Sequence, residues 1–231
     1  MTTLTLRDSG FLGSNVSDPN FANVKVLLHC NGSNGSSTFI DSSSNNLTVT
    51  RTGAAQVSTV ESYLGGASAY FNGASDSLTF ADPALGTDNF TIEMWVKTAS
   101  TVQYAQLIGN EGSGGFTFLI NNNSAGGGQL AVYAPGLVVS SSAGDWSDNA
   151  WHHFALTRSS GANLTLWVDG NSVGTGTSSA NFSGSATMYV GRNNVYTPRN
   201  MIGYIDEIRI TKGIARYNGT FTPPAAPFPD F

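Results

Sequence analysis

The fold is decided by the stretch WHHFALTRSSGANLTLWVDGN, residues 151–171. Two short apolar runs, residues 151–158 and 164–168, lie on either side of a small polar cluster, and their aromatic and β-branched residues favour strands. Asp169-Gly170 follows the second run directly. Because Asp-Gly between apolar runs is typical of a two-residue hairpin turn, we predict antiparallel strands here.

The same alternation of short runs and turn clusters extends over most of the chain. In Phe90–Thr98 the side chains of Phe90, Ile92, Met94 and Val96 share one face of the predicted strand. No window shows sustained helical periodicity, and the regular spacing of strands and turns favours an all-β sandwich or barrel. Further strands are predicted at Val24–Cys30, Ser68–Phe71, Ser77–Phe80, Ala105–Gly109, Phe116–Ile120, Leu130–Ala134, Leu137–Ser140, Met188–Gly191 and Ile202–Ile210.

The charge composition of the chain excludes some classes of binding partner. The 231 residues leave room for one sizeable core, and charged residues are only 11% of the chain, against about 25% in ordinary globular proteins. The net charge is -5 and the basic residues form no run. Neither nucleic acid nor an anionic membrane is therefore an expected partner. The single cysteine, Cys30, excludes an internal disulfide.

The two ends of the chain differ from its middle. Residues 1–23 contain scattered apolar side chains without alternation, and we expect an extended N-terminal arm that docks on its own domain or on a neighbour. No signal peptide and no apolar run long enough to span a membrane is recognised. The proline-rich end, Pro223–Pro229, is either a docked extended tail or a spacer.

Four segments together resemble a known family. They are AYFNG (69–73) with DSLTF (76–80), FTIEMWVK (90–97), WHHFALTR (151–158) with LTLWVDG (164–170), and YVGR (189–192) with GYIDEIRI (203–210). In this order they resemble the laminin-G-like branch of the concanavalin A-like lectin/glucanase superfamily, which includes the pentraxins. The resemblance covers about residues 24–220. It implies a jelly-roll sandwich of two antiparallel sheets, with residues 24–231 as one domain.

The end of the chain carries a narrower resemblance. GIARY (213–217), FTPP (221–224) and PFP (227–229) are similar to segments of domains in bacteriophage virion proteins. This resemblance implies a non-enzymatic virion component, either a capsid decoration or a tail-fibre protein. Its arm would bind other virion proteins, and its sandwich could bind host-surface glycans. The virion setting also implies a homo-oligomer, which we expect to be a trimer.

Catalytic chemistry is weakly represented. A glycosidase needs two facing carboxylates, whereas Asp206 and Glu207 are adjacent and should point to opposite faces of a strand, and Glu93 stands alone on its strand. Residues 170–174 match the G-x-S-x-G nucleophile pattern, but a hairpin is the wrong context for it. The adjacent His152 and His153 should face opposite ways and cannot bind one metal together, so packing or hydrogen bonding is the expected role of all three histidines.

Two sets of candidate site residues remain. Calcium takes oxygen ligands, and the resemblance makes Asp41, Asn46 and Asp206 the candidates for such a site. The other reading is that Asp41 caps a turn and that Asp206 pairs with backbone or arginine. For a glycan, aromatic and polar side chains outside the strands are the candidates: Tyr104, Trp146, Arg192, Asn193 and Tyr196. Trp95 and Trp167 lie inside strands and are expected to pack.

Three functions therefore stay open. The first is a non-enzymatic virion module. The second is a soluble carbohydrate-binding lectin, either with or without a requirement for calcium. The third, a glycoside hydrolase, would have to depend on Glu93 or Glu207.

Overall fold

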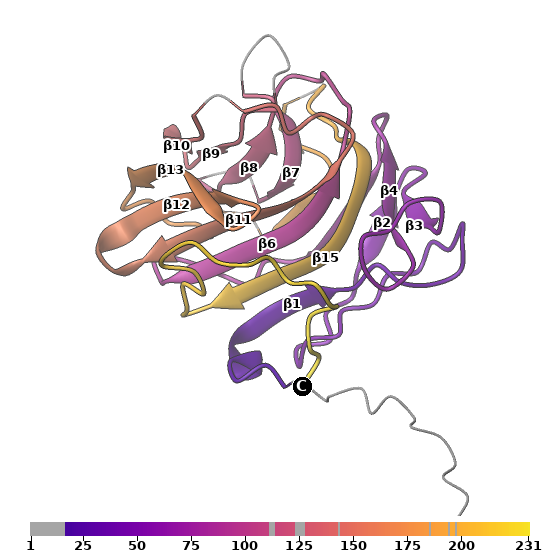
Figure 1. The fold of residues 1–231 in the computed structure, drawn as a ribbon, viewed down its shortest axis with the longest axis horizontal. Coiled ribbons are helices and arrows are strands. Elements are labelled where there is room, and N and C mark those ends of the chain that lie inside the picture. Colours follow the sequence, from indigo (N-terminus) through magenta and orange to yellow (C-terminus); the bar gives the residue numbers. More distant parts are fainter. Residues whose placement is uncertain are drawn as a thin grey trace, which may run out of the picture.

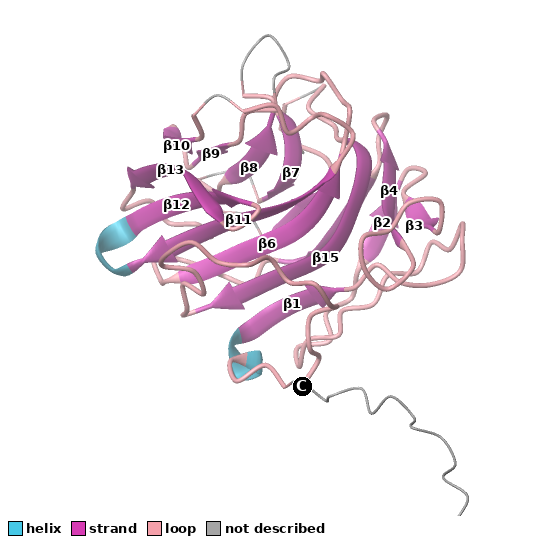
Figure 2. Ribbon diagram, in the orientation of Figure 1, coloured by secondary structure: helices cyan, strands magenta, loops and turns pink. Residues whose placement is uncertain are grey.

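The chain folds into two antiparallel β-sheets that lie face to face (Figures 1 and 2). The computed structural model describes residues 17–110, 114–122, 128–142, 144–184, 186–193, 195–196 and 198–231. Sheet A runs β13-β12-β11-β6-β15-β4-β3, and β1 also pairs with β15. Sheet B runs β10-β9-β8-β7-β14-β5-β2. The predicted all-β sandwich is confirmed.

The strands are short and mostly lie where the sequence predicts them. Sheet A holds β1 (Val24–Leu28), β3 (Gln56–Ser58), β4 (Ser68–Asn72), β6 (Phe90–Lys97), β11 (Trp151–Ser159), β12 (Asn163–Val168), β13 (Asn171–Thr177) and β15 (Ile202–Lys212). Sheet B holds β2 (Thr50–Thr52), β5 (Ser77–Ala81), β7 (Ala105–Gly109), β8 (Thr117–Ile120), β9 (Ala131–Tyr133), β10 (Leu137–Ser140) and β14 (Thr187–Val190). Single 3-10 turns lie at Phe21–Asn23 and Ser160–Ala162. No helix among the described residues is both long and apolar enough to cross a membrane.

The core lies between the two sheets. Phe90, Ile92, Met94 and Val96 of β6 all belong to it, as their predicted common face requires. Phe118 and Ile120 of β8 meet them from sheet B. The predicted hairpin is also confirmed, because Asp169 and Gly170 join β12 to β13 with φ angles of 48° and 79°. Two positive φ angles in a two-residue loop fit a type I′ turn.

The C-terminal segment, residues 213–231, crosses the outer face of sheet A (Figure 1). Tyr217 and Phe221 stack on each other with ring centroids 3.5 Å apart, and both approach Trp167 edge-on. Phe221 also donates its backbone N–H to the carbonyl of Gly170 at 3.0 Å. A Cβ at Gly170 would collide with the Phe221 carbonyl, so glycine is required at this crossing. Of the two readings of the tail, the docked one holds.

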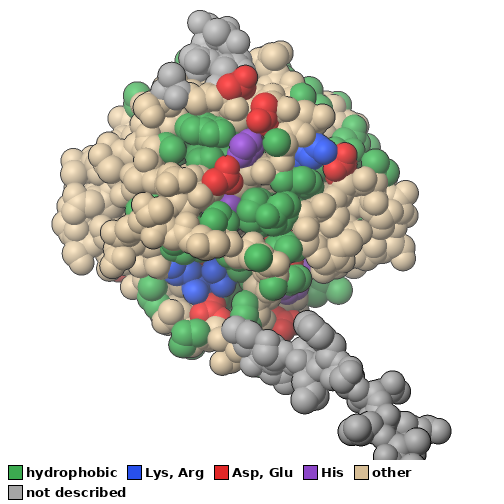
Figure 3. All heavy atoms as spheres, viewed as in Figure 1, with side chains coloured by type: hydrophobic (Ala, Val, Ile, Leu, Met, Phe, Trp, Pro, Cys, Tyr) green, Lys and Arg blue, Asp and Glu red, His purple; other side chains and the backbone are tan. Residues whose placement is uncertain are grey.

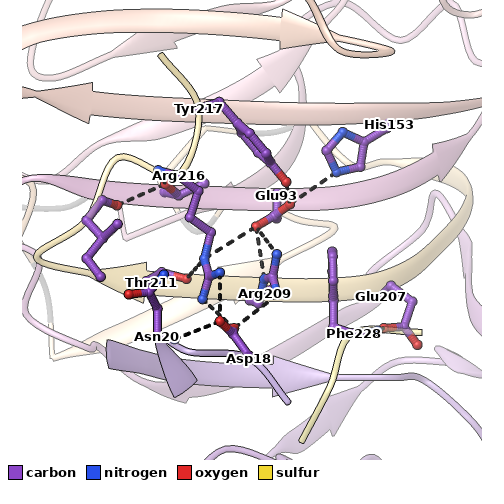
Figure 4. Close-up of polar contacts among 12 residues, drawn as sticks. Asp18, Asn20, Glu93, His153, Glu207, Arg209, Thr211, Arg216, Tyr217 and Phe228 are labelled. Carbon is purple, nitrogen blue, oxygen red and sulfur yellow. Dashed lines mark hydrogen bonds and ion pairs between the residues drawn. The ribbon is translucent and has the colours of Figure 1, made fainter. Parts of the chain in front are cut away.

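Four charged side chains meet beneath this covering segment (Figure 4). Glu93 of β6 accepts hydrogen bonds from Arg209 Nε at 2.9 Å and from the Tyr217 hydroxyl at 2.6 Å. Asp18 pairs with Arg216 at 2.6 Å and with Arg209 at 3.3 Å. The His153 ring lies 3.3 Å from Glu93. We call Asp18, Glu93, Arg209 and Arg216 the ion cluster; its two positive and two negative charges balance.

The ion cluster joins both ends of the described chain to the centre of sheet A. Asp18 precedes β1, whereas Arg216 follows β15. The backbone N–H of Asp18 also donates to the carbonyl of Phe231 at 2.9 Å. Part of the predicted arm therefore docks on its own domain. Residues 1–16 lie outside the described residues, and their anchoring role stays a prediction.

One prediction about β15 is wrong. Asp206 and Glu207 do not point to opposite faces, because the pairing of β15 with β6 shifts register between Asp206 and Arg209. Glu207 has a φ of 52°, and two residues instead of one separate Ile205 from Ile208, which both face the core. This β-bulge turns both carboxylates to the outer face of sheet A. There Asp206 accepts backbone N–H groups of residues 63 and 64, whereas Glu207 contacts His29 and the Phe228 N–H.

The prediction for the histidines holds. His152 and His153 face opposite ways: His153 contacts Glu93 on the outer face, whereas His152 stacks with the core residue Phe154 and contacts Asp169 at 2.7 Å. Trp95 and Trp167 also pack, but outside the sandwich core. Trp95 stacks against Tyr63 at 3.6 Å, and Trp167 lies under the tail. Apolar side chains and both signs of charge thus gather in a band across this face (Figure 3).

Glu93→Gln is predicted to destabilise the domain strongly. Burial alone would raise the pKa of Glu93, but Arg209, His153 and Tyr217 outweigh burial and lower the pKa to about 2. The carboxylate is therefore charged, and its loss would leave Arg209 and Arg216 to share the single carboxylate of Asp18 in a buried cluster. We expect the free energy of unfolding, measured with urea, to fall by about 3–5 kcal/mol.

The matched control is Glu61→Gln. Glu61 pairs with Lys97 at 2.8 Å, and a third of its side chain is exposed, so we expect a loss of at most about 1 kcal/mol. Equal losses for the two variants would contradict the central role of Glu93.

Candidate functional site

A small pocket lies on the outer face of sheet B. Two of the predicted ligand residues, Tyr104 and Tyr196, line it together. Its floor comes from β8, where Thr117 and Leu119 alternate with the core-facing Phe118 and Ile120. Its volume is about 210 Å³, and the remaining lining residues are Tyr133, Pro135 and Arg199. We call this set of seven residues the tyrosine pocket.

Arg199 lies against two of the tyrosines. Its guanidinium carbon is 4.8 Å from the ring centroid of Tyr104 and 4.4 Å from that of Tyr196. Both distances fall within the range of attractive cation–π contacts. The pocket thus combines flat aromatic faces with a fixed positive charge.

Tyr104 is held in an unusual conformation. Its φ is 58°, a left-handed value that an aromatic residue rarely adopts and that costs about 1–3 kcal/mol. Its backbone N–H donates to the Asn121 carbonyl at 3.0 Å, and its ring meets the Tyr133 ring edge-on at 6.3 Å. The Tyr133 hydroxyl donates to Asn122 at 2.8 Å. Strained backbone conformations of this kind are often found at ligand-binding and active sites.

Gln106, a buried residue of β7, fixes the loop that carries Tyr196. Its side-chain nitrogen donates to the Arg192 carbonyl at 2.6 Å, and its side-chain oxygen accepts from Asn193 at 2.9 Å. Asn193 in turn accepts the backbone N–H groups of Val195 and Tyr196. Asn193 therefore positions Tyr196 and does not line the pocket itself. Gln106 is not among the predicted residues, because a glutamine in a strand carries no functional signal.

Two predicted ligand residues lie outside the tyrosine pocket. Trp146 packs half-buried against the core, and its ring fills the space that a Cβ at Gly144 would need. Arg192 is half-buried, and its Nε has no hydrogen-bond partner among the described residues. The structure therefore brings together only Tyr104 and Tyr196 from the predicted set.

Tyr133, Arg199, Thr117, Leu119 and Pro135 were not predicted. Tyr133, Thr117 and Leu119 carried a sequence signal, because they alternate with the core residues Val132, Phe118 and Ile120 and so face outward. Arg199 reaches the pocket from the loop before β15, about eighty residues beyond β8 in the chain. No local pattern could join those segments.

Two of the three calcium candidates, Asp41 and Asp206, have side-chain partners within the protein. Asp41 is buried and accepts the N–H groups of Leu27, Ser43 and Leu47 at 2.8–3.0 Å. Asn46 is exposed in the same turn with a φ of 45°. Asp206 binds a different loop, and the described residues contain no group of three or more His, Cys, Asp or Glu that could hold a metal ion. The turn-capping reading of Asp41 therefore fits its contacts, and calcium binding stays a prediction.

Comparisons with known proteins assign this fold to a protein family. The family model of the concanavalin A-like lectin/glucanases superfamily, in its laminin-G-like form, matches residues 71–215. The fold and this match define a lectin-type sandwich domain. The chain belongs to this laminin-G-like family. A search of curated proteins finds no matching sequence.

Solved structures show the same fold at low sequence identity. The binding domain of paraclostridial mosquitocidal protein 1 is 15% identical with a TM-score of 0.64, over 83% of this chain and 49% of that one. The botulinum neurotoxin serotype D binding domain is 14% identical with a TM-score of 0.63, over 84% and 49%. The serotype C1 binding domain is 13% identical with a TM-score of 0.60, over 84% and 50%. The chain thus spans about half the length of these binding domains.

Asp206→Asn is predicted to stabilise the protein above neutral pH. Burial, together with nearby Glu207 and despite hydrogen bonds from Tyr63 and Leu64, raises the pKa of Asp206 to about 7. The folded protein then keeps a proton that the unfolded chain loses near pH 4. The free energy of unfolding should therefore fall as the pH rises from about 4 to about 7 and stay level above that.

Asparagine keeps the accepting oxygen without the charge. We expect the variant to be more stable than wild type at pH 8, by about 1.4 kcal/mol for each unit by which the pKa is raised, and equally stable at pH 4. Urea unfolding at both pH values measures this. Asp88→Asn on the surface should stay within about 0.5 kcal/mol of wild type, and a pH-independent effect of Asp206→Asn would refute the assignment.

Proposed function

We propose that the chain is a non-enzymatic carbohydrate-binding domain whose tyrosine pocket holds one sugar ring. The observation that carries this proposal is the grouping of Tyr104, Tyr133 and Tyr196 around a hollow of about 210 Å³. Drug-sized ligands occupy pockets of about 300–1,000 Å³, so this pocket fits a single ring. Membership of a lectin-type family supports the same class of ligand.

The chemistry of the pocket suits a saccharide. Tyrosine presents a rigid, amphipathic surface, and its side chain loses little conformational entropy when a ligand binds. It also offers a hydroxyl group beside its apolar ring face. Sugar rings expose apolar C–H faces that can lie on such rings, while their hydroxyls need polar partners at the rim. Tyr196, which is 48% exposed, leaves its ring available at the mouth of the pocket.

The positions of the buried glutamates favour a binding function over glycoside hydrolysis. Glycoside hydrolysis needs an acid and a base or nucleophile that reach the substrate. Glu93 and Glu207 are fully buried on the opposite sheet, and each already contacts a histidine. The contacts of Glu93 and Glu207 therefore give both carboxylates a structural role.

Tyr104→Leu is predicted to weaken glycan binding without unfolding the domain. Leucine keeps apolar volume but removes the flat face and the contact with Arg199. We expect about a tenfold loss of affinity, because an aromatic contact of this kind contributes about 0.5–1.5 kcal/mol beyond the area that it buries. A glycan array identifies the ligand, and calorimetry gives the affinity.

Tyr70→Leu is the matched control, because Tyr70 lines a different hollow, on sheet A. It should bind like wild type. Glycan binding that depends on Tyr70 and not on Tyr104 would place the site elsewhere. Repeating the array with calcium and with chelator tests the calcium-dependent alternative.

We also propose that this domain stands on the surface of a phage particle and is held there through residues 1–16. The supporting observation is the resemblance of the C-terminal segment to virion proteins; residues 217, 221 and 228 of that segment all pack on sheet A. A free lectin with the same pocket is the alternative. Trimeric assembly belongs to this proposal.

Deletion of residues 1–16 is predicted to release the domain from the particle while its melting temperature stays unchanged. The deletion spares Asp18 and therefore the ion cluster. Mass spectrometry of purified particles counts the copies for the full chain and for the truncated one. Hundreds of copies would indicate capsid decoration, and a few tens or fewer a tail device. Full retention of the truncated chain would overturn the anchoring role, and absence of the full chain would leave the free lectin.

A further inference from the structure

The Arg199 side chain contacts aromatic rings, whereas Arg158, Arg209 and Arg216 bind oxygen atoms of the protein. Arg209 and Arg216 pair with carboxylates of the ion cluster, and Arg158 donates to backbone carbonyls of Gly86, Ser178 and Ala180. Within the described residues, the Arg199 side chain makes no ion pair or hydrogen bond, only its two ring contacts. The described part of the fold therefore leaves the donors of Arg199 unused.

The position of Arg199 makes those donors available to a ligand. The tyrosine rings of residues 104 and 196 contact the guanidinium, and such stacking leaves N–H donors at the rim of its plane. No carboxylate is among the residues that line the pocket. In a protein of net charge -5, the aromatic hollow thus holds a cation that has no carboxylate partner among the described residues, and this cation can select an anion.

We infer that the tyrosine pocket recognises an acidic sugar, with the ring on the tyrosines and the sugar carboxylate on Arg199. This inference rests on the proposed function and adds the ligand class to it. A guanidinium binds a carboxylate through two parallel N–H···O bonds, which fixes both distance and orientation. A neutral sugar at the same place would leave Arg199 without an anionic partner.

The proposed anionic group of the ligand is a planar carboxylate, and the experiment also includes other anions for comparison. A sulfate ester carries the same charge in a tetrahedral shape, which matches the planar fork less well. An uronic acid and a sialic acid both present a carboxylate beside a sugar ring. Oligosaccharides that contain either one are therefore the ligands to try first.

The test compares each acidic oligosaccharide with its carboxyl-reduced and its sulfated counterpart, by calorimetry on the full chain. We expect the acid to bind about 10- to 100-fold more tightly than the reduced form, as a hydrogen bond to a charged group implies. The difference should shrink as salt is added. Arg199→Gln should remove the preference for the acid, so that the acidic and the reduced sugar bind the variant with equal affinity.

Arg199→Lys should restore only part of the preference, because lysine keeps the charge but lacks the fork. Arg51→Gln is the control: Arg51 is an exposed arginine on β2 whose contact is with the Gly53 carbonyl. Thermal unfolding checks that each variant is folded, and the comparison of sugars on wild type needs no variant.

The outcomes separate the two proposals. Equal affinity for the acidic and reduced sugars overturns the acidic ligand and leaves sugar binding intact. A preference for the acid that survives Arg199→Gln overturns the role of Arg199, and tighter binding of the sulfated form overturns the carboxylate. Failure of every sugar to bind overturns the proposed function together with this inference.

Discussion

The pairing of Glu93 with Arg209 is the interaction on which the rest of the structure depends. A carboxylate at the centre of a sheet is costly unless it is paired and hydrogen-bonded, and Glu93 obtains partners from β15, β11 and the C-terminal segment. Asp18 and Arg216 extend the pair to both ends of the described chain. The charges therefore oblige the terminal segments to cover sheet A.

That covering decides where a ligand can bind. The outer face of sheet A carries Trp95, Trp167, His153 and two bulged carboxylates, residues that alone would look like a binding or catalytic face. All are buried beneath the tail and the loop around Tyr63. The outer face of sheet B has an open aromatic hollow instead, formed where β8, β9 and the loop before β15 meet. The terminal segments thus close the outer face of sheet A, whereas a hollow stays open on the outer face of sheet B.

The tyrosine pocket is built on supports that do not touch its ligand space. Gln106 and Asn193 fix the loop that carries Tyr196, and Asn121 holds the strained backbone of Tyr104. Strain of this kind persists only where surrounding contacts over-determine it. The same fold in toxin binding domains, at 13–15% identity, shows that the sandwich tolerates nearly complete replacement of its sequence. Recognition therefore depends on the side chains of each chain, not on the shared architecture.

The sequence by itself determined the strands, the Asp169-Gly170 hairpin, the core face of β6 and the family, because alternation and turn chemistry are local properties of the chain. It also pointed to Tyr104 and Tyr196. Tertiary structure alone decided that Asp206 and Glu207 share a face, because a bulge changes the period of two that adjacency implies. It alone joined Asp18 to Arg216 and Arg199 to Tyr104, since such long-range contacts leave no periodic trace in a sequence. The short polar strands Thr50–Thr52 and Gln56–Ser58 escaped prediction for the same reason: they are strands only because β5 and β4 lie beside them.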